Sequence, residues 1–520
     1  MATAASVDAS SVDRSIRIRR RQVTVFATVA AAVLGVSLAE LGFGSPAAIA
    51  VLSALAVAVF VWRAPTAAII FLVGCAAVIE QFSLVAEGTF SDGTDRIPFF
   101  QSLNTGAGLG GIYATPFELF LGLLLFAWLI KGFAARTLVL RRTPMSFSLA
   151  AFAFLVGVGW VRGVLGGGSF TDSLLELRPW LYLVITFTVA SQLIKTEGQL
   201  RALLYALVTG IGLKGIQGVI TLSTHAGRPQ AILAHEESFF FGLFIALLAV
   251  LWMLGAGGRL RILMTGFFPF VLISDIANQR RTAWAIAAAV LITVFLVCFA
   301  AFPEHRKRIA TFGAIGACLA AMYWVGFSND PGLGGQPARA VLSVIAPSGR
   351  DQQSNQYRTV ENVNLGIAIR QTMPLGTGFG HPIPQAVPNV DISNIDSFIS
   401  YLPHNGVLYL WLRLGLLGIV AFWSMIGIAV MTAITTMRRQ KREIATLISL
   451  TVLAAIVAYV AQGFYDMGLY WFRIATVMGC LIGALEALGR MEPGLVRNSI
   501  APSPERVTRG LQKTKLDHAA

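Results

Sequence analysis

His404 is the residue of this sequence best placed to act as a general base. It lies where a long polar segment meets an apolar stretch, in Pro403-His404-Asn405-Gly406, so its imidazole is expected at the boundary between water and membrane. The histidine side chain titrates near neutral pH and can accept a proton from an attacking hydroxyl. The same position also suits a residue that merely caps the start of a helix. The sequence alone leaves both interpretations open.

Arginine is the second residue type that points to chemistry. Arg280 and Arg281 lie in a short hairpin between two apolar stretches, and Arg358 lies in the long polar segment. A guanidinium group offers a planar fork of donors that grips phosphate or carboxylate oxygens in pairs. These residues are therefore candidates for binding an anion such as a diphosphate. A codon bias that favours arginine throughout the chain is the competing explanation.

Two further cations fall inside apolar stretches. Lys214 lies near the middle of residues 202–222, and Arg413 follows His404 by nine residues, roughly 13 Å deeper along a helix. A charge at such a depth is costly in isolation, so each side chain must face a polar cavity or a partner. These residues either line a groove for a lipid diphosphate or pair with a buried carboxylate such as Glu80.

The composition indicates what must position these residues. The chain has 520 residues, of which 56% are hydrophobic and only 13% are charged. Water-soluble domains are about a quarter charged, so most of this surface must face hydrocarbon. We therefore expect an all-α polytopic membrane protein. The net charge of +14 does not indicate a nucleic-acid partner, because the basic residues gather at the ends of apolar stretches.

A helix that crosses the bilayer needs about 20 mostly apolar residues, and this length predicts about fourteen spans. They are residues 23–43, 46–62, 66–86, 116–130, 146–161, 179–194, 202–222, 238–255, 260–277, 283–302, 309–327, 405–434, 445–464 and 468–488. The predicted organisation is a basic tail at 1–22, spans 1–11 within 23–327, a long loop at 328–404, spans 12–14 within 405–488, and a polar tail at 489–520.

The basic residues also predict the orientation of the spans. Most Lys and Arg fall on the side of both termini, which the positive-inside rule assigns to the cytoplasm. The long loop then lies on the outer side of the inner membrane. Every basic residue on the outer side is arginine: Arg96, Arg162, Arg178, Arg228, Arg280, Arg281, Arg339, Arg350, Arg358 and Arg370. Solubility alone would admit lysine equally well, so this preference favours an anion-binding role.

The order of these residues resembles the O-antigen ligase and O-antigen polymerase superfamily of membrane glycosyltransferases. The resemblance covers roughly residues 200 to 480. It is carried by Arg281-Thr-Ala-Trp, by Ser354 with Arg358, by the Pro-Leu-Gly-x-Gly-x-Gly turn that begins at Pro374, and by His404-Asn with Gly415 further on. Asn362 stands where this family often has leucine, so the counterpart of the family's loop arginine is either Arg350 or Arg358.

The resemblance implies a GT-C-like helical fold and a metal-independent, inverting transfer of a glycan from undecaprenyl diphosphate to a sugar hydroxyl, without a cofactor. The acceptor is a lipid-anchored core for a ligase and another carrier-linked glycan for a polymerase. In this interpretation His404 is the base. The residues that bind the diphosphate are Arg281, Arg358, Arg280, Arg413 and Lys214. The reaction would take place on the outer face of the inner membrane.

Other functions remain open at this stage. A transporter or flippase of lipid-linked oligosaccharides would also have many spans and buried cations, and it would need Lys214 and Arg413 rather than His404. Asp351, Asp391 and Asp396 are scattered along the loop, which favours solvated charges without excluding a metal. Two sets of ionisable residues could contact sugar hydroxyls or cap helices. They are His235-Glu236-Glu237, and Glu176 with Arg178.

Overall fold

The computed structural model describes residues 46–81, 99–106, 113–136, 143–224, 232–347, 349–391 and 398–491, and the regular elements in these ranges are all helices. The α-helices are α2 (Pro46–Arg63), α3 (Pro65–Val78), α5 (Leu103–Gly106), α6 (Pro116–Ala134), α7 (Pro144–Leu165), α8 (Phe170–Leu193), α9 (Glu197–Thr224), α10 (Glu237–Leu254), α11 (Gly258–Ala277), α12 (Arg281–Ala301), α13 (Arg306–Phe327), α14 (Gln336–Ile345), α15 (Gly349–Thr372), α16 (Gly406–Arg439), α17 (Glu443–Tyr465) and α18 (Phe472–Arg490). Three short 3-10 helices are η1 (Pro303–His305), η2 (Leu333–Gly335) and η3 (Gly468–Tyr470).

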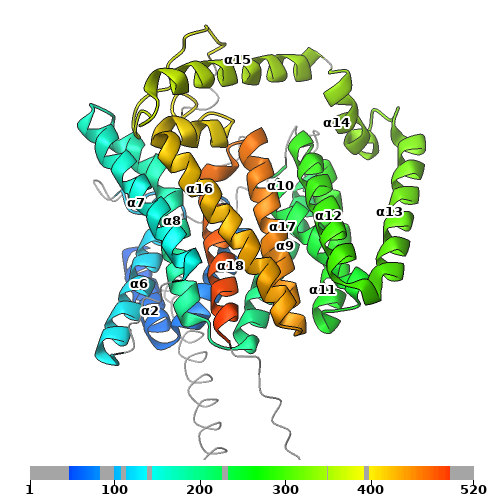
Figure 1. Cartoon of the computed structure of the whole chain (residues 1–520), viewed down its shortest axis with the longest axis horizontal. Helices are drawn as coiled ribbons and strands as arrows, with labels where there is room; N and C mark the ends of the chain where they lie inside the picture. The colour runs from blue at the N-terminus through cyan, green and yellow to red at the C-terminus, as the bar shows by residue number, and fades with distance from the viewer. Residues whose placement is uncertain are drawn as a thin grey trace, which may run out of the picture.

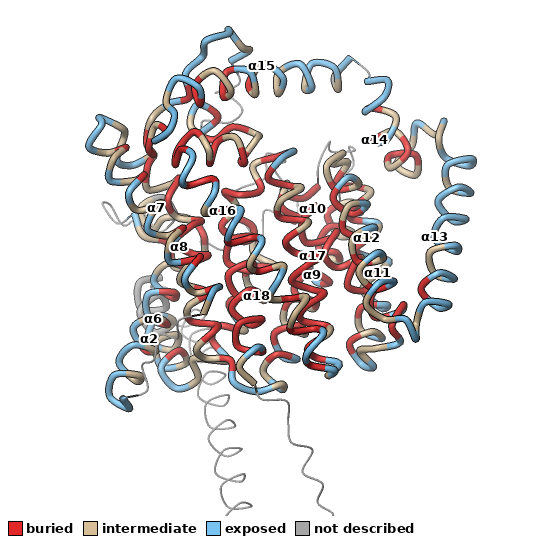
Figure 2. Tube along the Cα trace, in the orientation of Figure 1, coloured by how far each residue is buried: buried red, intermediate tan, exposed pale blue. Residues whose placement is uncertain are grey.

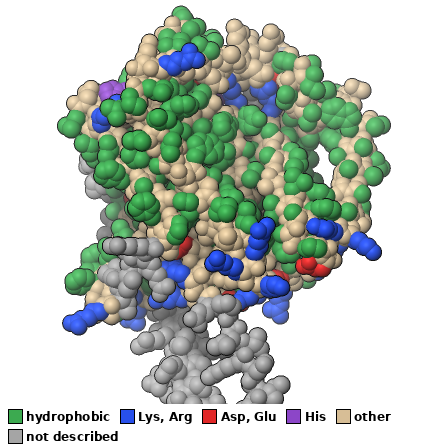
Figure 3. Space-filling view, in the orientation of Figure 1, with side chains coloured by type: hydrophobic (Ala, Val, Ile, Leu, Met, Phe, Trp, Pro, Cys, Tyr) green, Lys and Arg blue, Asp and Glu red, His purple; other side chains and the backbone are tan. Residues whose placement is uncertain are grey.

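Eleven helices of the described part are long and apolar enough to cross a membrane, namely α6 to α13 and α16 to α18. Two shorter apolar helices, α2 and α3, precede them. In Figure 3 apolar side chains cover most of the face shown, and many of the Lys and Arg side chains lie along its lower edge. The chain is therefore a multi-pass membrane protein, as the composition predicts. The predicted span at 23–43 lies outside the described residues, and the total of about fourteen spans stays a prediction.

The helices form a bundle whose centre is α10, α17 and α18, with α15 lying across one end (Figure 1). We call this end the α15 side. Figure 2 shows the central helices almost entirely buried, whereas α13 is exposed along nearly its whole length at the edge. Small residues allow the tight packing of α18 on α8, because a Cβ at Gly479 would meet the Leu183 carbonyl at 2.3 Å.

Two predicted spans have different bounds in the structure. The span predicted at 66–86 is the shorter helix α3, since the chain becomes extended at Ile79. The span predicted at 179–194 is α8, which begins at Phe170 because the Ser169 hydroxyl accepts a hydrogen bond from the Asp172 N–H at 3.3 Å. This earlier start places Glu176 inside the bundle, where it is fully buried.

The long segment predicted as a loop contains two helices, α14 and α15. The sequence predicts a helical stretch at 363–369 with Arg358 at its head, whereas α15 runs from Gly349 to Thr372 and Arg358 lies near its middle. A polar stripe explains the difference. Residues spaced three or four apart share one face of a helix, and here they are Asp351, Ser354, Arg358, Glu361 and Leu365. A search for apolar periodicity does not detect a helix whose inward stripe is mostly polar.

The helix α16 is broken at Gly415, about two and a half turns after its first residue. Gly415 has φ 67° and ψ −164°, and the Leu416 N–H donates to the Pro374 carbonyl at 2.8 Å instead of to its own helix. This backbone conformation is accessible essentially to glycine alone. The break seats the turn at 374–380 against α16.

We expect Gly415→Ala to destabilise the protein by about 2 kcal/mol or more, because the added Cβ is strained and would meet the Pro374 carbonyl oxygen. Gly427→Ala, in the same helix, is the matched control, since a Cβ at Gly427 meets nothing within 4 Å. Thermal unfolding in detergent measures both variants. Equal melting temperatures for the two would contradict this account of the break.

Candidate functional site

The carboxylate of Glu361 holds His404 at the start of α16. The His404 Nδ1 lies 3.3 Å from Glu361 Oε2, and the His404 backbone N–H donates to the same oxygen at 3.0 Å. Asn405 is the residue that caps α16, because its side-chain oxygen accepts from the Leu408 N–H at 3.0 Å. His404 is therefore not needed as the cap. A proton on Nδ1 directed at Glu361 leaves Nε2 as the nitrogen that can accept a proton.

His404 and Arg358 line one cavity of about 320 Å³ on the α15 side. Its lining residues are Asn355, Arg358, Thr359, Glu361, Asn362, His404, Asn405, Phe464 and Tyr465. Within the described chain, the buried Nε of Arg358 has no hydrogen-bond partner. A buried donor that lacks an acceptor is suited to an anionic ligand. Of the two candidate loop arginines, Arg358 lines the same cavity as His404, and the side chain of Arg350 lies outside the described part.

A second histidine–carboxylate pair lies close to this cavity. The His235 Nδ1 is 2.7 Å from Asp466 Oδ2, in the connections before α10 and after α17. Burial alone would raise the pKa of the Asp466 carboxyl, but His235, Arg358 and His404 together hold it far below its usual range. Asp466 thus remains an anion beside the cavity and partly offsets the positive charge there.

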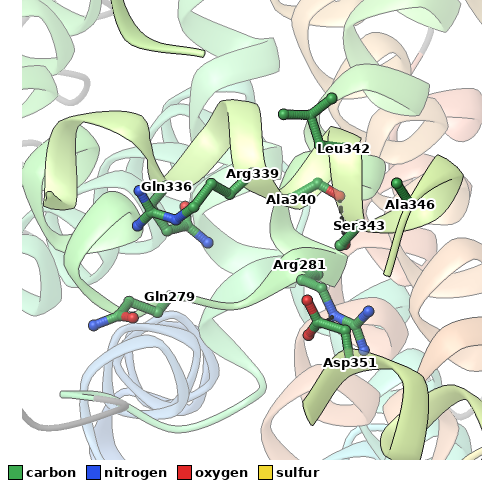
Figure 4. Close-up of a pocket in the computed structure, with 9 residues that line it drawn as sticks. All are labelled: Gln279, Arg281, Gln336, Arg339, Ala340, Leu342, Ser343, Ala346 and Asp351. Carbon is green, nitrogen blue, oxygen red and sulfur yellow. Dashed lines mark hydrogen bonds and ion pairs between the residues drawn. The ribbon is translucent and has the colours of Figure 1, made fainter. Parts of the chain in front are cut away.

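Arg281 lies in a neighbouring cavity of about 340 Å³, between α12, α14 and the start of α15 (Figure 4). Its Nε is 3.5 Å from Asp351 Oδ1, and its Nη2 donates to Ser354 Oγ at 3.5 Å. Arg280, the preceding residue, acts electrostatically on His235, as does Arg358. Arg281 thus contacts the polar stripe of α15 that carries Arg358, and Arg280 and Arg358 both act on His235.

Residues 266–423 match the family model of the O-antigen ligase. The chain carries an O-antigen ligase domain. This match covers a shorter part than the resemblance at residues 200 to 480. No curated protein matches the chain.

The O-antigen ligase domain runs from within α11 to the first half of α16 and contains His404, Arg281 and Arg358. His235 and Asp466 lie outside it, in the connections before α10 and after α17, and Asp466 interacts electrostatically with Arg358 and His404 of the cavity. Among the residues that the structure describes, no three His, Cys, Asp or Glu side chains are grouped as a metal site. The loop aspartate Asp396 and the predicted outer arginines Arg96 and Arg228 lie outside the described residues.

Arg413 is buried beneath the site in an ion pair with Glu176. Its Nε donates to Glu176 Oε1 at 2.8 Å, and both side chains are fully buried. Its Nη groups donate to Thr377 Oγ1 at 3.2 Å and to the His381 carbonyl at 2.6 Å. Glu176 also accepts from the Tyr409 hydroxyl at 2.6 Å. The contacts of Arg413 fasten the 374–380 turn to α8 and α16, which favours a structural role over a direct contact with substrate.

Lys214 is likewise paired inside the bundle. Its Nζ lies 2.6 Å from Glu80 Oε1 and 3.9 Å from Glu237 Oε1, and all three side chains are fully buried. Arg473 completes this group, 2.5 Å from the same oxygen of Glu237. The sequence leaves Lys214 between a substrate groove and a pair with a carboxylate such as Glu80. The structure places it in that pair.

The glycine-rich turn at 374–380 contacts protein backbone, as a plain turn would. The Gly378 N–H donates to the Arg413 carbonyl at 3.0 Å, and the Gly380 N–H donates to Glu176 Oε2 at 2.5 Å. Glu176 therefore links this turn to α8. Arg178 pairs with Glu118 at 2.9 Å instead of facing the site.

The sequence does not single out two residues at or beside these cavities, namely Glu361 and Asp466. Glu361 follows Arg358 by three positions, so the helical spacing of α15 is the signal that could identify it. Asp466 follows a predicted span and looks like an ordinary boundary residue. Its importance comes from His235, which is 231 residues away in the chain.

We expect Glu361→Gln to slow any glycan transfer that uses His404 as a base about 10- to 100-fold, because a protonated His404 would lose one charge-assisted hydrogen bond. The measurement is the initial rate of transfer by the purified full-length protein. Glu361→Asp is the companion variant and should recover part of the rate. An unchanged rate in Glu361→Gln would show that the carboxylate does not act on His404.

Proposed function

We propose that this protein is a membrane glycosyltransferase that moves a glycan from undecaprenyl diphosphate to a sugar hydroxyl, as a ligase or as a polymerase of cell-surface polysaccharide. The match of its O-antigen ligase domain supports a role in joining lipid-linked glycans. The observation that carries the proposal is the His404–Glu361 pair, which lies with Arg358 in a single cavity of that domain.

The geometry supports a one-step displacement at the anomeric carbon. The acceptor hydroxyl gives its proton to His404 Nε2 while its oxygen forms a bond to the anomeric carbon. The bond from that carbon to the diphosphate breaks, and the diphosphate leaves with the electron pair. Arg281, Arg358 and Arg280 stabilise the negative charge on the leaving group. Attack from the face opposite the leaving group inverts the anomeric configuration.

The proposed reaction needs no bound metal, because the arginines supply the positive charge that a divalent ion would otherwise bring to the diphosphate. The site would lie on the outer face of the inner membrane, with both termini in the cytoplasm, as the distribution of Lys and Arg predicts. The carrier would approach from the membrane, and the polar cavity on the α15 side would receive the sugars.

A transporter or flippase is the less favoured alternative. It requires Lys214 and Arg413 to face a path for the substrate, whereas both side chains are fully buried in ion pairs. The glycosyltransferase instead uses His404, whose side chain is 19% exposed and faces a cavity. No observation on the described residues favours transport over transfer.

The test uses the purified full-length protein in lipid nanodiscs with an undecaprenyl-diphosphate oligosaccharide and two acceptors. One acceptor is a lipid-anchored core, and the other is a second carrier-linked oligosaccharide. We expect a longer glycan, released undecaprenyl diphosphate and an inverted anomeric centre by NMR. The acceptor that reacts distinguishes ligase from polymerase. Activity that a chelator abolishes would refute the metal-independent mechanism, and the absence of any longer glycan with either acceptor would refute the transferase.

A further inference from the structure

We propose that Arg339, on α14, is a further substrate-binding residue of this reaction, and that with Arg281 it holds the donor's diphosphate in a cavity separate from that of His404. This inference rests on the proposed function and specifies where the donor's leaving group lies. It assigns the cavity in Figure 4 to the diphosphate and the cavity of His404 to the acceptor hydroxyl.

The cavity of Arg281 has the chemistry of an anion site. Figure 4 shows α14 crossing above the cavity with Arg339 and Gln336, while the Arg281–Asp351 pair lies below. Two guanidinium groups from different helices therefore line a polar cavity of about 340 Å³. Each fork can bind two phosphate oxygens, so a diphosphate can engage both arginines at once. The Asp351 carboxylate is the opposing charge in this cavity.

Contacts with the protein fix Arg339 in place before any ligand binds. Its Nη1 donates to the Asp330 carbonyl, which anchors the guanidinium to the turn before α14. The adjacent Gln336 is buried, and its side-chain oxygen accepts from Trp284 Nε1 at 2.7 Å. This bond ties the first residue of α14 to α12, the helix that carries Arg281. Ordered donors of this kind lose little freedom on binding an anion.

The separation of the two cavities matches the geometry of an inverting reaction. The base and the leaving group lie on opposite faces of the anomeric carbon. The base nitrogen is one hydrogen bond from the attacking oxygen, and the attacking and leaving oxygens each lie about 3 Å from the carbon. The base nitrogen and the leaving oxygen are therefore on the order of 9 Å apart. Along α15, Ser354 contacts Arg281 and Glu361 contacts His404. Ser354 and Glu361 are seven residues apart, which corresponds to about 10 Å of helix rise. Arg358 lies between them on α15, so it can contact the diphosphate from the side of the sugar.

The surroundings of the cavity suit the lipid part of the same donor. Leu342 lines the cavity, and the neighbouring Val341, Val344 and Ile345 of α14 are exposed apolar side chains. The adjacent helix α13 is also exposed and apolar along most of its length. A polyprenyl chain attached to a diphosphate at Arg281 and Arg339 can therefore continue directly onto apolar surface.

The test measures binding of undecaprenyl diphosphate without a glycan to the full-length protein in detergent. We expect Arg339→Gln to weaken binding at least 10-fold and to raise the KM for the donor, with a smaller change in kcat. Arg438→Gln is the matched control, because Arg438 is an exposed arginine in the last turn of α16, and it should bind like the unmodified protein. Asp351→Asn, which removes the opposing charge, should bind at least as tightly as the unmodified protein.

The outcomes separate this inference from the proposed function. If the unmodified protein binds undecaprenyl diphosphate and transfers glycan, but Arg339→Gln binds it equally well, the role of Arg339 is refuted and the transferase stands. If the unmodified protein neither binds the diphosphate nor transfers glycan, both proposals fail. If Arg339→Gln does not fold, Arg339→Lys is the deciding variant. Weaker binding of undecaprenyl diphosphate by Arg339→Lys supports two-oxygen binding by the Arg339 guanidinium, and unchanged binding refutes it.

Discussion

Replacing His404 with glutamine is expected to lower the rate of glycan transfer about 10²- to 10⁴-fold, the usual contribution of a general base. Glutamine keeps a polar side chain of similar size but cannot take the proton of the attacking hydroxyl. Because the proposed diphosphate contacts are made by arginines, we expect the KM for the donor to change much less than kcat. Single-turnover assays with the purified full-length protein measure both quantities.

The control for this variant is His305→Gln. His305 lies in η1, at the end of α12 remote from the α15 side, and it should leave the rate unchanged. A His404→Gln variant that keeps more than a third of the normal rate, while binding donor normally, would assign the proton transfer to another group. His235 would then be the first residue to replace, because its pair with Asp466 lies beside the same cavity.

Arg413→Met is expected to cause the largest loss of stability, about 3–5 kcal/mol, because it leaves Glu176 buried without its counter-charge. The replacement also removes the hydrogen bonds that hold the 374–380 turn against α16. A marginally stable protein should then yield little folded material. The melting temperature and the folded fraction after size-exclusion chromatography measure this effect.

A double variant distinguishes a structural role of Arg413 from a substrate-binding one. Glu176→Gln in the Arg413→Met background removes the uncompensated charge. The glutamine oxygen can accept from the Gly380 N–H at the Oε2 position, and the glutamine NH2 group can donate to the Tyr409 hydroxyl oxygen at the Oε1 position. We expect this double variant to recover much of the lost stability. A single Arg413→Met variant that folds normally but no longer binds the donor would instead support the diphosphate contact that the family resemblance implies.

The sequence by itself determined the class of this protein. The low fraction of charged residues required a membrane protein, and the apolar stretches located most of the helices of the described part, because crossing a bilayer demands a length and composition that are visible locally. The motif at Arg281, Arg358 and His404 also indicated the resemblance to the O-antigen ligase family, and the match confirmed an O-antigen ligase domain at residues 266–423. These features depend on short segments and their order along the chain.

Only the tertiary structure decided the partners of the ionisable groups. Arg413 and Glu176 are 237 residues apart, and no local pattern reveals that they are paired. Lys214 and Glu80 are 134 residues apart, and the sequence offered this pair only as one of two alternatives. A buried charge must find a counter-charge wherever the fold supplies one, and helix packing determines which helices meet. For the same reason, Glu361 beside His404 and Arg339 opposite Arg281 became visible only when α14 and α15 were placed over the bundle.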